Sequence, residues 1–289
     1  MTTVLTAPTR IFAHRGFSSR QPEMTLAAYQ EAIAWSFAEG VPVGLECDVQ
    51  LTADNVLVCL HDPTLSRTSN VQGRVADWSV SELRKVDFGS WRTPFPNESQ
   101  RSLVTLAELL SLVRDARNSG AEVTLAIETK HDQSSSATIE QQVCDLLESH
   151  GWDRAGAPVR LITFSRAGVE LLAGRVPELD RTLLVEKDLS PYVSGQLPDG
   201  VKVAGLEMRL LRRHPEFVAR ARSCGNEVHA WTVNHVADIR LCRDLGVTGI
   251  TSDYPDRVLD VLRSSEDAEP TLVLMRPTPR RRRFRILAA

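Results

Sequence analysis

Short apolar runs alternate with longer stretches of helical periodicity along most of the chain. The runs have the length of strands, and they lie at Ile11–His14, Gly44–Val49, Val56–His61, Thr124–Thr129, Arg160–Phe164, Thr182–Glu186, Ala204–Met208, Val228–Val233 and Gly249–Ser252. Helical spacing of apolar residues predicts helices at Leu26–Glu39, Thr105–Asn118, Ala137–Ser149, Arg166–Val176, Pro215–Ser223 and Val236–Leu245. Strands that alternate with helices predict βαβ units and a parallel sheet.

The nine strand candidates are one too many for an eight-stranded α/β barrel. Val56–His61 follows Gly44–Val49 too closely for the crossover that joins parallel strands. Asp54 and Asn55 are a plausible turn pair, so residues 44–61 predict an antiparallel hairpin. The other strands predict an α/β fold of the TIM type, an (α/β)₈ barrel with a hairpin inserted after its second strand.

The segment after the hairpin, residues 62–104, contains several Pro and Gly and a single short helical pattern near Ser81–Val86. It predicts a small subdomain over one end of the barrel. We therefore expect an N-terminal extension at 1–10, a barrel at 11–262 with an insertion at about 62–104, and an Arg-rich tail at 263–289. In such barrels the chemistry lies at the C-terminal ends of the strands.

Composition and cysteine usage bear on the compartment. The chain has no run of 18 apolar residues, and residues 1–10 lack the apolar segment of a secretory signal. Its five Cys form no C-x-x-C pair, and Cys47 and Cys59 lie in apolar strand patterns, where Cys acts as a small hydrophobe. These features predict a reduced, cytoplasmic protein.

Charge is distributed unevenly along the chain. Residues 276–289 carry six Arg and no acidic residue, so the net charge of −3 leaves −9 for the rest of the chain. Because the chain outside this tail is so acidic, we expect no binding of nucleic acid. The basic tail could contact an anionic membrane weakly, and the alternative is a solvated, disordered terminus.

Carboxylates gather at two of the predicted strand ends. Because side chains alternate along a strand, Glu46 and Asp48 share a face, as do Glu128 and Lys130. If both faces look into the barrel mouth, three carboxylates converge, and a cation is needed to neutralise them. Ligation by oxygen alone favours one divalent Mg²⁺, Ca²⁺ or Mn²⁺ rather than Zn²⁺.

The hairpin brings a histidine to the same place. With the turn centred between Asp54 and Asn55, position 48 pairs with position 61, so His61 would lie beside Asp48, unless the register slips by one residue. His14 ends the first strand, and two histidines can serve as an acid/base pair. A lone His at a strand end is more often structural, however.

Two cationic residues could hold a phosphate. Arg15 and Lys130 have the charge and the donors for this role, although Lys130 could simply be a salt-bridge partner of Glu128. Trp231 lies in an apolar strand, where the barrel core is its ordinary position.

At these residues the chain resembles the glycerophosphodiester phosphodiesterase family. The similar segments, in chain order, are Ala13–Gly16, Pro22–Tyr29, Leu45–Thr52, Leu60–Thr68, Thr105–Leu110, Ile127–Lys130, Trp231–Asn234 and Gly249–Pro255. The resemblance covers about residues 11–262 and rests on the order and spacing of these segments. It implies a barrel with an insertion after the second strand, which agrees with the strand count.

The resemblance also implies roles. Glu46, Asp48 and Glu128 would bind the metal, and His14 and His61 would be the general acid/base pair. Arg15 and Lys130 would contact the phosphate, and Trp231 would line the glycerol side of the pocket. A small glycerophosphodiester would give glycerol 3-phosphate and an alcohol. Met24 stands where the family usually has Asn, which loses a hydrogen-bond donor and acceptor.

Three other functions are considered. A lysophospholipase D-type activity would favour an apolar mouth built from aromatic residues of the insertion, namely Trp78, Phe88, Trp91 and Phe95. Lys130 could form a Schiff base, but imine chemistry does not need three carboxylates and two His. A non-enzymatic binding protein is disfavoured by the intact set of acid/base and metal-ligand candidates.

Overall fold

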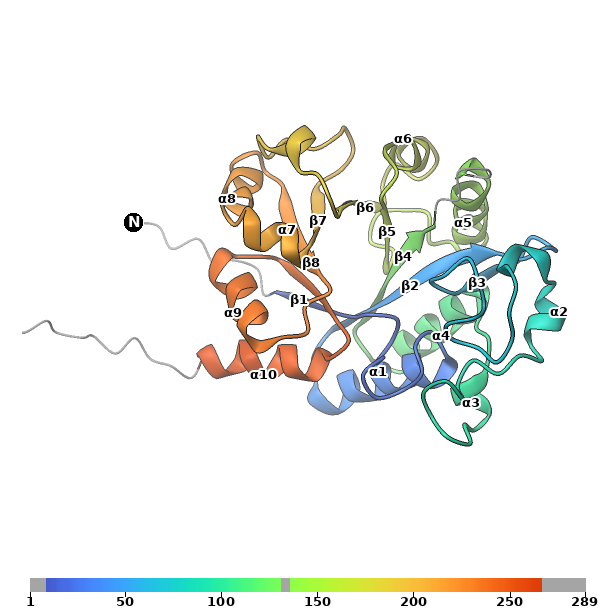
Figure 1. Cartoon of the computed structure of the whole chain (residues 1–289). Coiled ribbons are helices and arrows are strands. Elements are labelled where there is room, and N and C mark those ends of the chain that lie inside the picture. Colours follow the sequence, from blue (N-terminus) through green and yellow to red (C-terminus); the bar gives the residue numbers. More distant parts are fainter. Residues whose placement is uncertain (1–8, 131–135, 267–289) are drawn as a thin grey trace, which may run out of the picture.

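The computed structural model describes residues 9–130 and 136–266 and contains a closed parallel barrel (Figure 1). Its strands are β1 (Arg10–Ala13), β2 (Val43–Leu51), β4 (Val123–Thr129), β5 (Val159–Thr163), β6 (Asp180–Val185), β7 (Val203–Glu207), β8 (Glu227–Trp231) and β9 (Gly249–Ser252). They pair in chain order, and pairing of β1 with both β9 and β2 closes the barrel. The predicted (α/β)₈ TIM-type fold is confirmed.

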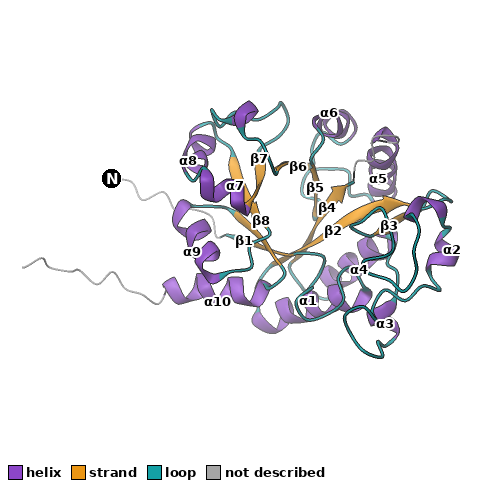
Figure 2. Ribbon diagram, viewed as in Figure 1, coloured by secondary structure: helices purple, strands orange, loops and turns teal. Residues whose placement is uncertain are grey.

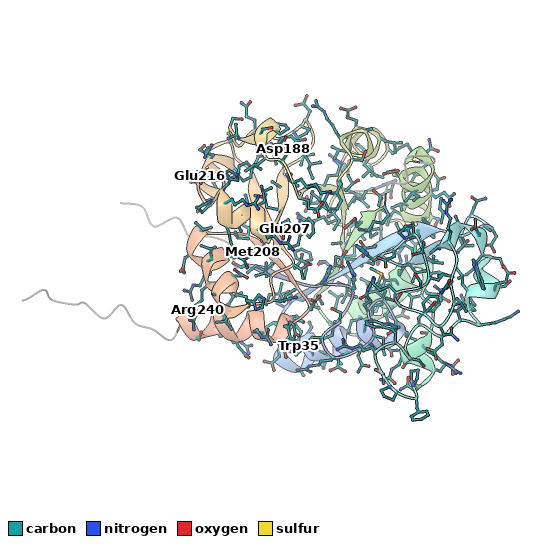
Figure 3. All side chains as sticks on the ribbon, in the orientation of Figure 1. Trp35, Asp188, Glu207, Met208, Glu216 and Arg240 are labelled. Atoms are coloured by element: carbon teal, nitrogen blue, oxygen red, sulfur yellow. The ribbon has the colours of Figure 1, made fainter. Side chains whose placement is uncertain are left out.

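Helices surround the barrel strands (Figure 2). They are α1 (Leu26–Glu39), α4 (Leu106–Asn118), α5 (Ser136–His150), α6 (Arg166–Arg175), α7 (Met208–Arg213), α8 (Glu216–Ser223), α9 (Val236–Leu245) and α10 (Pro255–Glu266), with a 3₁₀ turn η2 at Ser190–Tyr192. Figure 3 shows Glu207 and Met208 where β7 passes into α7, and Arg240 on α9. The sequence pattern missed α7 and α10.

The hairpin exists, but its predicted register is wrong by one residue. β3 (Leu57–Cys59) pairs antiparallel with β2, and Val49 lies opposite Cys59, so Asp48 lies level with Leu60 rather than His61. The turn is longer than the two residues assumed, because the Thr52 N–H donates to the carbonyl of Val56, the Val56 N–H donates to Thr52 Oγ1, and Asn55 takes a left-handed φ of 56°. Such three-residue turns shift the pairing of a hairpin by one position.

The insertion has a small apolar core of its own. Two buried residues, Leu65 and Leu83, pack there with Phe88, and Trp78 packs against them at its edge. Two short helices, α2 (Val80–Leu83) and α3 (Glu98–Arg101), and a 3₁₀ turn, η1 (Val75–Asp77), lie in this segment, so the single predicted helix is an underestimate. Phe95, by contrast, is 99% exposed.

Two apolar layers position the site. The larger packs the outer faces of the strands against the helices and includes Cys47 and Cys59, and all five cysteines are free. The smaller fills the barrel interior with Phe12, Ala126 and Ile162, among others. Polar strand ends lie above and below this interior layer. No helix within residues 9–130 or 136–266 is long and apolar enough to cross a membrane. The predicted Arg-rich tail lies almost wholly outside the described residues.

Candidate active site

Three carboxylates converge at the C-terminal ends of β2 and β4. Asp48 is the register neighbour of Glu128, and Glu46 lies two residues before Asp48 on the same face. One oxygen of each of the three side chains lies within 4.8 Å of the others, and all three residues are buried. The predicted convergence is confirmed, and the cluster could hold a metal ion.

The carboxylates destabilise one another in their charged forms. Burial and the neighbouring Asp48 raise the pKa of Glu128 to about 8 and that of Glu46 well above its usual range. Burial would also raise the pKa of Asp48, but Lys130 and Arg15 lower it to about 2. The buried Asp48 Oδ2 accepts no hydrogen bond. An all-oxygen set with an unsatisfied atom fits a hard divalent cation.

Two cations border the cluster. Lys130 Nζ lies 2.8 Å from Asp48 Oδ1 and also pairs with Glu128, while Arg15 Nε lies 3.4 Å from Asp48 Oδ2. Burial would lower the pKa of Lys130, but these two carboxylates raise it. A Schiff-base lysine needs the opposite shift, so the imine alternative loses support.

The β1–α1 loop turns sharply around the cluster. Arg15 has a φ of 56° and Gly16 a φ of 79°. A Cβ at Gly16 would lie 2.7 Å from the backbone of Ala28, so this close approach requires glycine. The turn directs the backbone N–H of Arg15 toward Glu46 Oε2, to which it donates a 2.9 Å hydrogen bond.

His14 is held by a carboxylate that sequence reasoning did not identify. Its Nδ1 lies 2.6 Å from Asp253 Oδ1, at the end of β9. Asp253 also accepts from Ser18 Oγ at 3.0 Å and from Asn234 Nδ2 at 2.6 Å. Burial would raise the pKa of Asp253, but the hydrogen bond with His14 and the others lower it to about 2. The imidazole therefore faces an ionised, fully engaged carboxylate.

His61 is held in a similar way. Its Nδ1 lies 2.5 Å from Asp62 Oδ1, and Arg67 Nε donates to Asp62 Oδ2 at 2.6 Å. Although the hairpin register differs from the prediction, His61 still lies close enough to Asp48 for its charge to lower the pKa of that carboxyl. Both histidines thus engage Nδ1 with a carboxylate and leave Nε2 for other contacts.

Two aromatic side chains, Trp231 and Phe164, lie at another part of the barrel mouth. Trp231 donates from Nε1 to the carbonyl of Gly205 at 3.0 Å, and the rings of Trp231 and Phe164 meet edge to face at 5.5 Å. Trp231 and Glu128 line the same small cavity, of about 40 Å³. Phe164 was not predicted as a site residue, although period-two alternation with Ile162 would place it on the barrel's inner face.

The fold and the site define a TIM-barrel protein with an acidic, candidate metal-binding centre at the C-terminal ends of its strands. The chain belongs to the glycerophosphoryl diester phosphodiesterase family, whose model matches residues 14–257. The resemblance seen in the sequence and the expected phosphoric diester hydrolase are therefore confirmed.

Individual relatives cover nearly the same part of the chain. "Probable glycerophosphodiester phosphodiesterase 1" of Mycobacterium tuberculosis is 35% identical, over 86% of this chain and 90% of its own length. The glycerophosphodiester phosphodiesterase of Bacillus subtilis is 30% identical, over 87% and 86% respectively.

Solved structures share the fold. An Oleispira antarctica phosphodiesterase in complex with the product sn-glycerol-3-phosphate has a TM-score of 0.74 at 22% identity, and the match covers 89% of this chain and 97% of that one. A glycerophosphodiester phosphodiesterase from Agrobacterium tumefaciens has a TM-score of 0.68 at 26% identity, with 87% of this chain and 99% of that one covered.

Proposed function

We propose that the protein hydrolyses glycerophosphodiesters to sn-glycerol 3-phosphate and an alcohol, in a reaction that requires a divalent cation. The observation that carries the proposal is the buried cluster of Glu46, Asp48 and Glu128, with a carboxylate-paired histidine on each of two neighbouring segments. The membership of the family and the sn-glycerol-3-phosphate bound to the Oleispira protein support the substrate class.

The three carboxylates would hold the cation, with Mg²⁺ or Ca²⁺ favoured and Mn²⁺ compatible. Their oxygens are the ligands that these ions prefer, and their mutual repulsion would be relieved on binding. A bound divalent cation would supply positive charge for the non-bridging oxygens of a phosphodiester.

His14 and His61 would be the general acid/base pair. A carboxylate at each Nδ1 fixes the orientation of the ring and leaves Nε2 to exchange a proton with substrate. One ring would accept the proton of the attacking hydroxyl, and the other would donate one to the departing alcohol.

The remaining polar and aromatic groups would bind the substrate. Arg15 and Lys130 would hold the phosphate and disperse its charge. Trp231, supported by the ring of Phe164, would line the glycerol side of the pocket. Cytoplasmic localisation, the three-part chain organisation and weak membrane contact by the tail remain predictions.

A lysophospholipase D-type activity is the second candidate. It is favoured by one observation, the exposure of Trp91 and Phe95 on the insertion, whereas Phe88 and Trp78 belong to the insertion's own core. Hydrolysis of lysophosphatidylcholine measured beside glycerophosphocholine separates the two substrate classes.

The first test measures glycerol 3-phosphate released from glycerophosphocholine and glycerophosphoethanolamine with Mg²⁺, Ca²⁺, Mn²⁺ or EDTA. We expect release that needs metal and falls at least about 100-fold in His14→Ala and His61→Ala, the scale of general acid–base catalysis. His214→Ala, at the exposed end of α7, is the matched control and should retain activity. Release that persists in EDTA would contradict the metal requirement, and normal activity of either site variant would contradict its histidine's role.

A further inference from the structure

A continuous chain of hydrogen bonds joins Arg15 to His61 around the rim of the site. Glu23 Oε1 accepts from Arg15 Nη1 and from Arg67 Nη2, both at 2.8 Å, and Glu23 Oε2 accepts from Arg67 Nη1 at 2.9 Å. Arg67 also donates to both oxygens of Asp62, at 2.6 and 3.3 Å. Asp62 in turn lies 2.5 Å from His61 Nδ1.

Arg67 is the centre of this chain. One planar guanidinium binds two carboxylates at once through its fixed fork of donors, which the single ammonium of a lysine cannot reproduce. The Arg67 side chain is 42% exposed. Ion pairs with that much exposure add little to folding stability, so stability alone does not account for so complete a set of bonds.

The bonds of Arg67 connect two separate parts of the chain. Asp62 and Arg67 belong to the insertion, whereas Arg15 and Glu23 belong to the β1–α1 loop of the barrel. His61 lies beyond the end of β3 at Cys59, and Gln50 Nε2 on β2 donates to its carbonyl at 3.1 Å, which holds its backbone but not the orientation of its ring. Arg92, bound to the carbonyl of Ser19, and Gln100, bound to Gln21, also join the insertion to the β1–α1 loop, whereas Arg67 binds Asp62, the carboxylate that holds the His61 ring.

We propose that Arg67 and Glu23 form a positioning unit that sets His61 against Arg15 in the reactive arrangement. Neither residue has to touch the substrate for this role: Arg67 acts through Asp62 on the His61 ring, and Glu23 acts on the Arg15 guanidinium. The effect on catalysis rests on the proposed phosphodiesterase function, but the effect on the His61 ring does not.

The kinetic test uses Arg67→Ala and Arg67→Lys with glycerophosphocholine. We expect kcat to fall about 10- to 100-fold in both, the range for outer contacts that orient site groups. The melting temperature should change no more than in Arg175→Ala. Arg175 is a matched control, because it is 38% exposed and binds Asp145 and Glu148 at 2.7 and 3.0 Å on the outer helices. Added guanidinium at non-denaturing concentration should restore part of the activity of Arg67→Ala but not of Arg67→Lys.

A double-mutant cycle tests whether the two residues act together. If Glu23 and Arg67 are one unit, Glu23→Gln combined with Arg67→Ala should be about as active as the weaker single variant. Losses that multiply would contradict a shared role, as would an Arg67→Ala variant with the activity of Arg175→Ala.

A spectroscopic readout separates this inference from the proposed function. In ¹H–¹⁵N spectra of the histidine rings, His61, assigned with His61→Gln, should show one Nδ1–H tautomer in the wild type and a mixture in Arg67→Ala. An unchanged His61 signal would overturn the positioning role even in an active enzyme. A changed signal in a protein that releases no glycerol 3-phosphate with any metal would support the positioning role and overturn the proposed function.

Discussion

The two ends of the barrel interior both carry charged side chains, but they arrange the charges differently. At the C-terminal end, Glu46, Asp48 and Glu128 crowd together, and burial and the charge of Asp48 raise the pKa values of Glu46 and Glu128. At the N-terminal end, each charge meets an opposite charge or a neutral donor: Arg160 Nη2 donates to Asp180 at 2.7 Å. The barrel therefore has carboxylates that repel one another at its C-terminal end and charges with opposite partners at its N-terminal end.

The N-terminal network extends across several strands. Arg10 on β1 pairs with Glu227 on β8, and Thr248 Oγ1 donates to Glu227 Oε2 at 2.9 Å. His229 Nε2 lies 3.2 Å from Arg10 Nη2. Arg160 is buried, and a buried charge is costly unless it is paired, so its contact with Asp180 supports folding. Arg10 and Glu227, by contrast, are 45% and 43% exposed, so their pair adds little. The excess of negative charge at the other end is destabilising by itself, and the proposed divalent cation would neutralise it.

The largest expected effect comes from removing one charge at the C-terminal end. Glu128→Gln should lower phosphodiesterase activity about 1000-fold, since one ligand of the proposed cation would be lost. It should leave the free energy of unfolding in EDTA unchanged or raise it, since a like-charge repulsion is removed while Lys130 keeps Asp48 as a partner.

The matched change at the other end is Asp180→Asn. It should leave activity unchanged and lower stability by roughly 1 kcal/mol, because Arg160 loses its charged partner. Activity assays and urea denaturation measure both quantities. A large stability loss in Glu128→Gln, or a large activity loss in Asp180→Asn, would contradict the division of roles between the ends.

The next effect concerns stability in acid. Burial lowers the pKa of His229 from 6.5 to about 4. Between those pH values the imidazole is protonated in the unfolded chain but neutral in the folded one, so the unfolded chain binds more protons. The free energy of unfolding therefore keeps its full value above pH 6.5 and falls as the pH is lowered toward 4. The loss is at most about 3 kcal/mol. Urea denaturation from pH 7.5 to 4 should show a shallower decline for His229→Gln than for the wild type.

Asp48 and Glu227, whose pKa values are both lowered to about 2 by their hydrogen bonds and charged partners, also lose stabilising interactions in acid. The difference between variant and wild type is therefore the quantity to compare. His214→Gln, on an exposed helix end, is the control and should decline in parallel with the wild type. Parallel curves for His229→Gln would refute the assignment.

A third effect concerns the hydrogen bond between Asp253 and His14. Asp253→Asn removes the negative charge at His14 Nδ1 and places an amide among the donors of Ser18 and Asn234. We expect kcat to fall about 100-fold, with a smaller change in KM, because the ring loses the carboxylate that orients it. Ser18→Ala, which removes a single neutral donor, should cost much less. Equal losses in the two variants would contradict the special role of the carboxylate.

The sequence predicted the barrel because its signals are local. Apolar runs and helical spacing identified every barrel strand, and alternation along β2 and β4 predicted the convergence of Glu46, Asp48 and Glu128 that the structure shows. The hairpin register was wrong because it depends on the left-handed conformation of Asn55, which sequence spacing does not reveal.

The supporting contacts of the site were not predictable in the same way. His14 and Asp253 lie 239 positions apart, and Arg67 and Glu23 lie 44 apart. Such pairs arise only when the strand ends and the insertion meet in space, and no local pattern marks them. The residues proposed to face the reaction centre could be inferred from the sequence, whereas the contacts that orient them are visible only in the structure.

The smallest expected effect concerns backbone strain at the functional end. Met24 is 3% exposed and has a left-handed φ of 57°, and its N–H donates to the carbonyl of Arg15 at 2.9 Å. Asn tolerates this conformation better than Met, so Asn at this position would adopt the loop with less strain. Met24 therefore retains the loop geometry at a cost of about 1 kcal/mol.

Paired truncations can isolate that cost. Met24→Ala and Met24→Gly both delete the buried side chain, but only Gly adopts a positive φ freely, so Met24→Gly should be the more stable by about 1 kcal/mol. Met208, also 3% exposed, begins α7 with ordinary helical geometry, and there the order should reverse, with Ala the better by roughly 0.5–1 kcal/mol. Urea denaturation of the four variants measures both differences. The same order at both positions would show that the loop beside the carboxylate cluster stores no strain, and would leave charge repulsion as the sole difference between the two ends of the barrel.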